Sequence, residues 1–285
     1  MKQIVFISGK GGTGKSTVVA SLSLLIENKI MADCDVDAPN LHLLLCGKRL
    51  KEDDYYGAEQ AVIDSAACTS CGLCRQVCRF DAVSQDIDIL PMKCEGCGAC
   101  VLACPVSAIS LENVKTGQTF VDSTPRGTFS HALLDIGAEG SGKLVTEVKE
   151  NLFGFINGEE WAIVDGCPGI GCSVIASITG ADAVVVVCEP TKSGQSDMER
   201  VLSVARHFGI PAAVCINKYD LNLRLTASIE HYCEKNGFPV VGKISFEPEI
   251  VKALQKLQTP VEAEITNVTR EIERLWSRLK SEFGK

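Results

Sequence analysis

Gly9-Lys10-Gly11-Gly12-Thr13-Gly14-Lys15-Ser16-Thr17 is a glycine-rich stretch close to the start of this 285-residue chain. It fits the pattern G-x4-G-K-[ST], in which glycines let successive backbone N–H groups converge on phosphate oxygens at the start of a helix. The apolar residues 4–7 predict a short buried strand before the loop, and residues 17–26 predict the helix after it. This motif requires that strand–loop–helix order, so the stretch predicts a site for a nucleoside triphosphate.

The remainder of the chain alternates predicted strands with predicted helices. The expected strands comprise residues 161–165, 183–188, 211–217 and 240–244, and the expected helices comprise residues 193–208 and 223–236. This alternation predicts an α/β fold, a P-loop NTPase with a mostly parallel sheet flanked by helices. A stripe of apolar residues at helical spacing predicts a C-terminal helix packed onto this body: Ile265, Val268, Ile272, Leu275, Leu279 and Phe283.

Eight of the fifteen cysteines form two copies of the spacing C-x2-C-x2-C-x3-C. An offset of 26 residues aligns positions 68–83 with 94–109, which indicates an internal duplication. The spacing is that of bacterial ferredoxins, in which three thiolates of one run and the fourth of the other run bind one [4Fe–4S] cluster. The predicted ligands are therefore Cys68, Cys71, Cys74 and Cys104 for cluster I, and Cys78, Cys94, Cys97 and Cys100 for cluster II.

Zinc is the main alternative for these thiols. It usually takes two close cysteines and a distant pair, whereas each run here has three cysteines in seven residues, so the spacing favours clusters. Arg79 follows Cys78 where simple ferredoxins usually have proline, which leaves the surroundings of cluster II open.

The expected domains are an ATPase domain of residues 1–57 and 113–285 and an inserted small α+β ferredoxin-like domain of residues 58–112. The polar residues 48–54 are expected to mark a boundary, and the glycine-rich residues 117–142 an irregular return linker.

Composition narrows the class of protein. The formal charge of −8 argues against non-specific binding to nucleic acid, which relies on clustered Lys and Arg. No apolar run approaches the roughly 18 residues of a membrane span, so no stable membrane insertion is expected. No export signal precedes the loop, and reduced thiols in the cytoplasm are therefore expected. Most of the seven cysteines outside the two runs lie in apolar stretches, where a thiol acts as a small hydrophobe.

Lys10 gives the loop the form K-G-G-x-G-K-[ST], which resembles the deviant Walker A loop of the MinD/ParA/Mrp superfamily, a group that includes the nitrogenase iron protein. The resemblance implies that Lys10 crosses a dimer interface to the partner's nucleotide. Asp33-Cys34-Asp35 resembles switch I, in which Asp35 would orient the attacking water. A calcium loop also begins D-x-D-x-D, but it needs Gly and Glu where this chain has Ala38 and Leu44.

Two later stretches extend the resemblance. Asp165-Gly166-Cys167-Pro168-Gly169 resembles Walker B running into switch II, with Asp165 holding Mg²⁺ through water. In Asn217-Lys218-Tyr219-Asp220, the asparagine would read adenine as in MinD-type proteins. The same four letters fit the guanine-reading N-K-x-D of GTPases, and the deviant loop favours ATP.

Nearly the whole chain, from residue 1 to about 260, resembles MinD-superfamily P-loop ATPases that contain an inserted ferredoxin domain. The stretches that carry this resemblance are residues 37–42, 141–145, 165–172 and 189–191. It implies ATP, Mg²⁺ and two [4Fe–4S] clusters as cofactors. The expected catalytic residues are Lys10, Lys15 and Asp35, and the expected ATP and Mg²⁺ ligands are Gly9, Gly11, Gly12, Thr13, Gly14, Lys15, Ser16, Thr17, Asp165 and Asn217.

Three functions fit these features. The first is a dimeric ATPase whose nucleotide state is coupled to electron transfer from the clusters to a redox partner. The second is an Mrp-type carrier that delivers a metallocluster to an acceptor protein, and the third is a MinD/ParA-like positioning ATPase with structural clusters. The dimer could be a homodimer or a heterodimer with a paralogous ATPase. Cys172 lies seven residues after Asp165, the offset at which the nitrogenase iron protein places a ligand of its subunit-bridging cluster, so a third cluster is a further hypothesis.

Overall fold

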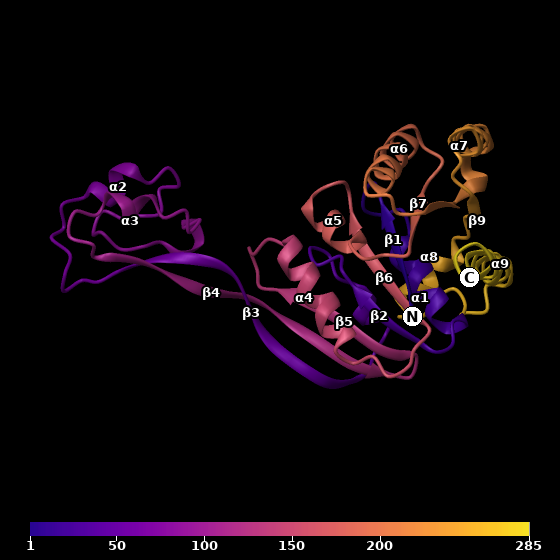
Figure 1. The fold of residues 1–285 in the computed structure, drawn as a ribbon, viewed down its shortest axis with the longest axis horizontal. Helices are drawn as coiled ribbons and strands as arrows, with labels where there is room; N and C mark the ends of the chain where they lie inside the picture. Colours follow the sequence, from indigo (N-terminus) through magenta and orange to yellow (C-terminus); the bar gives the residue numbers. More distant parts are fainter. Residues whose placement is uncertain (285) are drawn as a thin grey trace. The chain divides into compact units, whose positions relative to one another are not determined.

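Residues 1–284 are described by a computed structural model, and the strands among them follow the order β3-β4-β5-β2-β6-β1-β7-β8-β9 in one sheet (Figure 1). The chain divides into two compact units. Unit 1 comprises residues 1–52, 119–133 and 140–285, and unit 2 comprises residues 53–118 and 134–139. The long strands β3 (Lys48–Ile63) and β4 (Ile109–Thr124) contribute residues to both units.

The centre of unit 1 is a set of parallel strands whose side chains are almost all buried. These are β1 (Lys2–Ser8), β2 (Lys29–Asp33), β6 (Trp161–Pro168), β7 (Ala183–Cys188), β8 (Ala212–Asn217) and β9 (Val240–Ile244). Strands buried on both faces have continuous apolar sequences, which is why the apolar runs in β1, β6, β7, β8 and β9 predicted these strands correctly. In the register of β2 and β6, Asp33 lies opposite Asp165, so both acids reach the same edge of the sheet.

Helices cover both faces of these strands. On one face, α1 (Lys15–Leu25) and α9 (Thr266–Phe283) pack on alternate strand residues such as Ile4, Phe6 and Ile163. On the other face lie α4 (Gly142–Phe153), α5 (Cys172–Ile178) and α6 (Lys192–His207), which contact β2, β6 and β7 respectively. The remaining helices of unit 1 are η1 (Leu41–Leu43), η3 (Tyr219–Asn222), α7 (Leu223–Asn236) and α8 (Glu249–Gln255). The parallel α/β fold predicted from the sequence is confirmed.

The predicted packing of the C-terminal helix is also confirmed. Val268, Ile272, Leu275 and Leu279 of α9 are buried, and α9 contacts both α1 and β9. Trp276 of the same helix meets Trp161 edge to face, with ring centroids 4.9 Å apart. Among residues 1–284, no helix is both long enough and apolar enough to cross a bilayer.

Of the two expectations about the segments that flank unit 2, one is confirmed and one is wrong. Residues 48–54 do mark a boundary, because units 1 and 2 meet between residues 52 and 53, although these residues are the first part of β3. Residues 117–134 form the end of β4 and all of β5 (Gly127–Leu134), not an irregular linker. Only residues 125–126 connect β4 to β5, and the Thr124 hydroxyl closes this turn by donating to the carbonyl of Gly127. Much of β3 is exposed, so its polar residues lack the buried pattern that identifies a strand.

Unit 2 contains two halves that repeat each other at the 26-residue offset. Its short helices α2 (Leu73–Val77) and α3 (Ala99–Ala103) each begin after a glycine in the left-handed region, with φ of 76° at Gly72 and 73° at Gly98. Asp81 and Ser107, also 26 residues apart, both have φ of 51°. Positive φ at a residue other than glycine is uncommon, so its recurrence shows that the sequence duplication is a duplication of backbone conformation.

Lys29 yields a test of the packing of unit 1. Its ammonium group is buried at the start of β2 and donates to the carbonyls of Ile26 (2.7 Å) and Arg126 (2.6 Å). Burial, followed by the nearby Arg126 charge, lowers the pKa of Lys29 from 10.5 to about 8. Between these two pH values the unfolded chain binds the extra proton, so the contribution of Lys29 to the free energy of unfolding rises as the pH increases.

We therefore expect the difference in unfolding free energy between the wild type and Lys29→Met to shift in favour of the wild type as the pH rises. Urea unfolding of both proteins between about pH 7.5 and about pH 9.5 measures this difference. Because the two proteins share all other titrating groups, the contributions of those groups cancel in the comparison. A pH-independent difference would contradict the lowered pKa.

Candidate functional site

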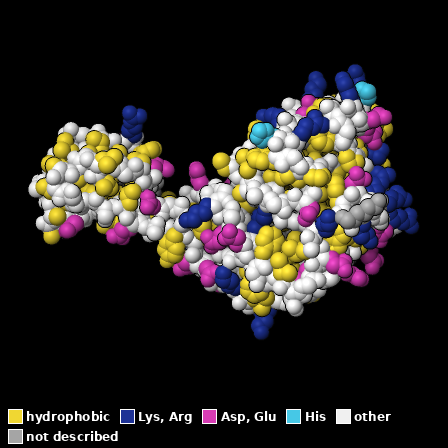
Figure 2. Space-filling view, viewed as in Figure 1, with side chains coloured by type: hydrophobic (Ala, Val, Ile, Leu, Met, Phe, Trp, Pro, Cys, Tyr) yellow, Lys and Arg dark blue, Asp and Glu magenta, His cyan; other side chains and the backbone are white. Residues whose placement is uncertain are grey.

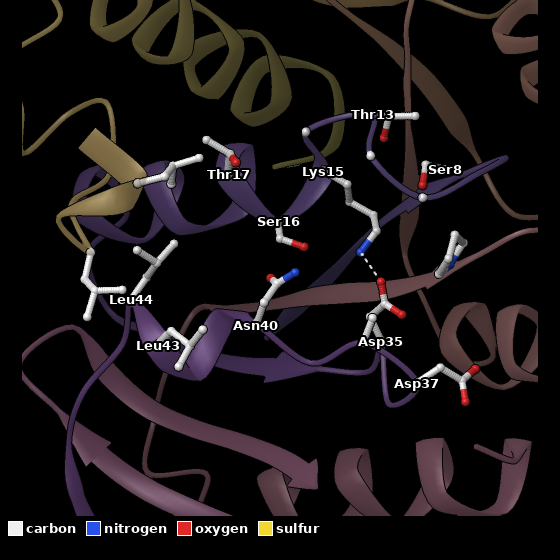
Figure 3. A pocket seen from close by; sticks show the side chains of 17 residues that line it. Ser8, Thr13, Lys15, Ser16, Thr17, Asp35, Asp37, Asn40, Leu43 and Leu44 are labelled. Atoms are coloured by element: carbon white, nitrogen blue, oxygen red, sulfur yellow. Dashed lines mark ion pairs between the residues drawn. The ribbon is translucent and has the colours of Figure 1, made fainter. Parts of the chain in front are cut away.

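The glycine-rich loop connects β1 to α1 and forms one wall of a cavity of about 540 Å³ (Figure 3). Gly14 precedes the helix with φ of 85°, and a Cβ atom there would lie 2.2 Å from Nδ2 of Asn217. Glycine is therefore required at this position both by the backbone conformation and by the close approach of a side chain. The cavity is lined on this side by the loop residues Gly11, Gly12, Thr13, Gly14, Lys15, Ser16 and Thr17.

The opposite wall of the cavity comes from residues 34–44, which follow β2 and include η1. We call these residues the switch segment. Asp35, Asp37, Asn40, Leu43 and Leu44 of this segment line the cavity, and Asp35 and Asn40 point toward the loop (Figure 3). The structure thus brings the predicted residue Asp35 together with the predicted loop. The sequence analysis did not assign Asp37 or Asn40 to the site, although both lie within a stretch that carried the family resemblance.

Lys15 is the cation at the centre of the site. Its Nζ atom lies 2.6 Å from Oδ1 of Asp165 and 3.5 Å from Oδ2 of Asp35. Burial opposes the charge of this ammonium, but the carboxylates of Asp165 and Asp35 outweigh burial and raise the pKa of Lys15. Lys15 therefore stays charged and balances part of the surrounding negative charge.

Asp33 is a third acid at this point, buried at the end of β2. Its carboxylate accepts hydrogen bonds from the backbone N–H groups of Asp35 and Leu41, each at 3.1 Å. Burial, followed by the neighbouring charge of Asp165, raises the pKa of Asp33 to about 8. Three carboxyl groups thus surround one ammonium group, and the electrostatics of the site favour an additional cation.

Oδ2 of Asp165 is buried and has no hydrogen-bond partner among the described residues. In residues 1–284, no three His, Cys, Asp or Glu side chains converge to hold a metal ion by themselves. Mg²⁺ is commonly held by one or two carboxylates together with substrate phosphates, so it does not need such a cage. The buried oxygen of Asp165 and the hydroxyl of Ser16 on the cavity wall are suitable ligands for a phosphate-bound Mg²⁺.

Lys10 lies apart from Lys15. Its Nζ atom donates to Oγ of Ser193 (3.3 Å), lies 3.8 Å from Oε2 of Glu189, and its side chain is 37% exposed. Lys10 is not among the residues that line the cavity. The side chain of Lys10 therefore does not enter the cavity of its own chain, although this residue belongs to the loop.

Asn217 lies at the end of β8 and joins the loop to a second cavity of about 220 Å³. Its Nδ2 atom donates to the Thr13 carbonyl at 2.7 Å, and its Oδ1 atom accepts from the N–H of Lys218 at 3.0 Å. The walls of this cavity are mainly apolar and include Ile244, Phe246, Ile250, Val251, Leu254 and Pro260. The sequence analysis missed these residues because no motif marks them, and they approach the loop only through the packing of α8 and α9.

Asp220, the last residue of the N-K-x-D stretch, does not line the second cavity. Its carboxylate accepts a hydrogen bond of 2.8 Å from the N–H of Phe246 and so holds the segment that follows β9. The acid that stands where GTPases have their guanine-reading aspartate therefore has a structural partner in this chain.

Five of the eight cysteines of the two runs surround the small apolar interior of unit 2. Cys74 is buried there with Ala61, Val83 and Ile109, and Cys78, Cys94, Cys100 and Cys104 pack against them. All of these thiols are free, and none forms a disulfide. A small cavity of about 20 Å³ is lined by all four thiols predicted to bind cluster II, namely Cys78, Cys94, Cys97 and Cys100.

The sulfur atoms in unit 2 accept hydrogen bonds from the backbone. The N–H of Ala82 donates to Cys78 at 3.3 Å, and the N–H of Ala108 donates to Cys104 at 3.2 Å, so this bond recurs at the 26-residue offset. The N–H of Ala61 likewise donates to Cys94 at 3.5 Å. Hydrogen bonds to sulfur are among the features that set the reduction potential of iron–sulfur clusters.

The cysteines outside the two runs occupy different environments. Cys34, Cys167, Cys188, Cys215 and Cys233 are buried, as expected for small hydrophobic residues, whereas Cys46 and Cys172 are exposed. Cys172 is the first residue of α5.

Comparison with known proteins assigns the family. The sequence profile of the CobQ/CobB/MinD/ParA nucleotide-binding domain matches residues 4–261. The chain belongs to this family. It is 35% identical over 229 residues to the uncharacterized protein MJ0578 of Methanocaldococcus jannaschii, covering 77% of this chain and 79% of that protein. It is 29% identical over 228 residues to MJ0579 of the same organism, covering 78% and 82%.

Solved structures of low sequence identity share the fold. MinD of Pyrococcus furiosus has a TM-score of 0.61 at 18% identity, with 98% of each chain covered. MinD in the MinC:MinD complex of Aquifex aeolicus has a TM-score of 0.60 at 18% identity, with 99% of this chain and 96% of that chain covered. MinD of Pyrococcus horikoshii, solved with Mg-ADP, has a TM-score of 0.58 at 17% identity, with 99% and 96% covered. Together with the family match and the loop, these identify a P-loop ATPase of the MinD/ParA type.

The two lysines of the loop differ in environment and therefore in their effect on stability. Lys15→Met leaves the buried carboxylate of Asp165 and the partly buried carboxylate of Asp35 without their cation. We therefore expect it to lower the unfolding free energy of the nucleotide-free chain by about 3–5 kcal/mol. Lys10→Met removes a half-exposed contact and should change it by less than about 1 kcal/mol. Denaturant unfolding without nucleotide at about pH 8 compares the two variants. Equal losses would contradict the central role assigned to Lys15.

Proposed function

We propose that this chain is an ATP-binding and ATP-hydrolysing dimeric switch that carries two [4Fe–4S] clusters in unit 2. Its nucleotide state would be coupled to electron transfer from unit 2 to a partner protein. The observation that carries the proposal is the duplicated thiol environment of unit 2 on the same chain as a MinD/ParA-type ATPase site. The inserted ferredoxin domain of this proposal comprises residues 58–112.

The nucleotide part of the proposal rests on the two adjoining cavities. Lys15, Ser16 and Thr17 would hold phosphates and Mg²⁺, and Asp165 would support the ion through its unpartnered oxygen. The adenine would enter the apolar cavity beside Asn217, and Asp35 would orient the attacking water. The structure of the P. horikoshii MinD with Mg-ADP supports a nucleotide with Mg²⁺ in this fold.

The dimeric part rests on Lys10. This residue resembles the signature lysine of the superfamily, and its half-exposed side chain lies outside the cavity of its own chain. Both features suit a residue that reaches the nucleotide of a second subunit. Because MJ0578 and MJ0579 are both related to this chain, a heterodimer with a paralogous ATPase is as consistent with this role as a homodimer.

The residues of unit 2 fit iron–sulfur clusters. The free thiols, the backbone N–H groups directed at sulfur and the apolar interior are features that cluster sites share. In a cubane site each thiolate binds a different iron atom, so the thiols need not converge on one ion. Cluster I would be held by Cys68, Cys71, Cys74 and Cys104, and cluster II by Cys78, Cys94, Cys97 and Cys100. When bound, such clusters supply one-electron transfer.

The surface of unit 2 suits contact with a partner protein. Met92, Leu102 and Phe80 are 81%, 91% and 45% exposed, and Figure 2 shows hydrophobic side chains over much of this body at the left of the view. Leu102 lies between Cys100 and Cys104 in the chain, so an apolar surface is available beside the thiols. A redox protein or a cluster acceptor could bind there.

A positioning ATPase with structural clusters is the second candidate. The structural similarity to MinD of P. furiosus covers 98% of both chains at 18% identity, and this coverage favours the positioning function. An Mrp-type carrier would differ from both candidates by losing its clusters to an acceptor protein. The stability, redox activity and transfer of the clusters therefore distinguish the three.

The metal content tests the cluster sites. We expect anaerobically purified protein to contain about eight irons per chain with the spectra of [4Fe–4S] centres. Cys78→Ser should remove about four irons and the signal of cluster II, because its sulfur lines the cavity with Cys94, Cys97 and Cys100. Cys46→Ser is the matched control, since this exposed thiol lies outside both runs. Zinc as the main metal, or selective loss of cluster I in Cys78→Ser, would refute the assignment.

Redox titration tests the coupling. We expect the potential of at least one cluster to differ between the nucleotide-free protein, the ADP complex and the complex with a non-hydrolysable ATP analogue. Linkage then requires that reduction change the nucleotide affinity by the same free energy by which the nucleotide changes the cluster potential. For a one-electron couple, a tenfold change in affinity corresponds to a potential shift of about 59 mV. Lys15→Met, which should not bind nucleotide productively, is the control. Superimposable titrations with equal affinities for the oxidised and reduced protein would contradict the coupling.

A further inference from the structure

A pair of histidines, His131 buried and His42 partly buried, lies behind the wall of the nucleotide cavity. His42 belongs to η1 in the switch segment, and His131 belongs to β5. Their rings are stacked, with centroids 5.3 Å apart and planes 6° from parallel. The residues on either side of His42 in η1, Leu41 and Leu43, are buried and exposed respectively, and Leu43 lines the cavity (Figure 3).

His131 is held from the side of the sheet by a chain of polar contacts. Its Nε2–H group donates to Oδ2 of Asp122 on β4 at 3.0 Å. Oδ1 of Asp122 accepts from Nε of Arg49 on β3 at 2.6 Å, and the Arg49 guanidinium lies 3.9 Å from the centroid of the Phe120 ring. We call His42, His131, Asp122 and Arg49 the histidine network; all four belong to unit 1.

The switch segment is held from its other side by the acids of the nucleotide site. Asp33 accepts the N–H of Leu41, the residue directly before His42, at 3.1 Å. The same segment presents Asp35 and Asn40 to the cavity. η1 therefore contacts two groups of residues. Leu41 donates to one of the acids around Lys15, and His42 stacks on His131.

Two atoms in the network have no partner among the described residues. Nδ1 of His42 and Nδ1 of His131 are both buried and make no hydrogen bond. Burial lowers the pKa of His131 despite the opposing effect of Asp122, so its ring is neutral and Nδ1 is an unsatisfied acceptor. An unsatisfied buried acceptor destabilises the folded protein. A protein can retain such an acceptor when the group gains a hydrogen-bond partner in another state of its functional cycle.

We propose that His42 and His131 are positioning residues for ATP hydrolysis. His131, oriented by Asp122, would hold His42 and thereby fix the switch segment that places Asp35 at the cavity. When bound nucleotide displaces this segment, the stack would transmit the displacement to Asp122 on β4 and Arg49 on β3. These are the two strands that continue into unit 2. The inference rests on the ATPase site and does not require that unit 2 contain clusters.

The kinetic test compares removal of the ring with its replacement. We expect His42→Ala to lower kcat about tenfold and to change KM by less than about twofold, because the residues that hold the phosphates remain in place while Asp35 loses its orientation. His42→Phe keeps an aromatic ring at the stack and should restore kcat to within about twofold of the wild type. Glu230→Gln, which breaks an exposed ion pair with Lys243 elsewhere in unit 1, is the control and should have wild-type kinetics.

The transmission test uses amide hydrogen exchange in residues 48–52 of β3 and 119–124 of β4, with ADP and with a non-hydrolysable ATP analogue. The wild type and His42→Phe should show different protection in the two nucleotide states, and Asp122→Asn should lose that difference. The proposal is overturned if His42→Ala has wild-type kcat, if His42→Phe fails to restore it while melting as the wild type does, or if exchange in the wild type is the same in both states. Iron content in the same samples reports separately on the clusters.

Discussion

The ion pair between Lys15 and Asp165 is the contact on which the arrangement of the nucleotide site depends. The register of β2 against β6 places Asp33 opposite Asp165, and the loop after β1 delivers Lys15 to the same point. Carboxylates this close repel one another, and burial adds to the cost of their charge. Only a cation between them makes the cluster tolerable, so the buried lysine of the loop stabilises the same site in which it would bind phosphate.

This arrangement explains why the motifs predicted part of the site and not the rest. Lys15 begins α1, Asp35 follows β2 and Asp165 lies in β6. Each belongs to a local sequence pattern, and the structure brings all three to one point. The apolar wall beside Asn217 has no such pattern, because Phe246 and Leu254 enter the cavity from segments whose placement depends on α8 and α9. The contact between His42 and His131 joins residues 89 positions apart in the chain and depends on the pairing of β5 with β2, which the sequence analysis did not predict.

The same contrast applies to the fold. Strands with continuous apolar residues, such as Ala183–Cys188 and Val240–Ile244, were predicted with their observed bounds. Residues 48–54 were not recognised as a strand because most of their side chains are exposed and charged. Residues 117–134 were mistaken for a linker because Gly, Ser, Thr and Pro interrupt their apolar residues, although most side chains at the end of β4 and in β5 are buried. Their backbone groups are satisfied by pairing with a neighbouring strand, a source of order that composition does not report.

The small interior of unit 2 supports the proposal that this unit binds metal. Its interior consists of Ala61, Cys74, Val83 and Ile109 with partly buried neighbours, which is little apolar surface for a body of this size. Domains with so small a core generally need disulfides or metal to fold, and the thiols here are free. In the proposed assignment each cluster takes three thiolates from one half of the duplication and the fourth from the other, so neither half completes a site alone. Cluster binding would then hold the two halves together, and loss of the clusters should unfold unit 2 while leaving the helices and parallel strands of unit 1 in place.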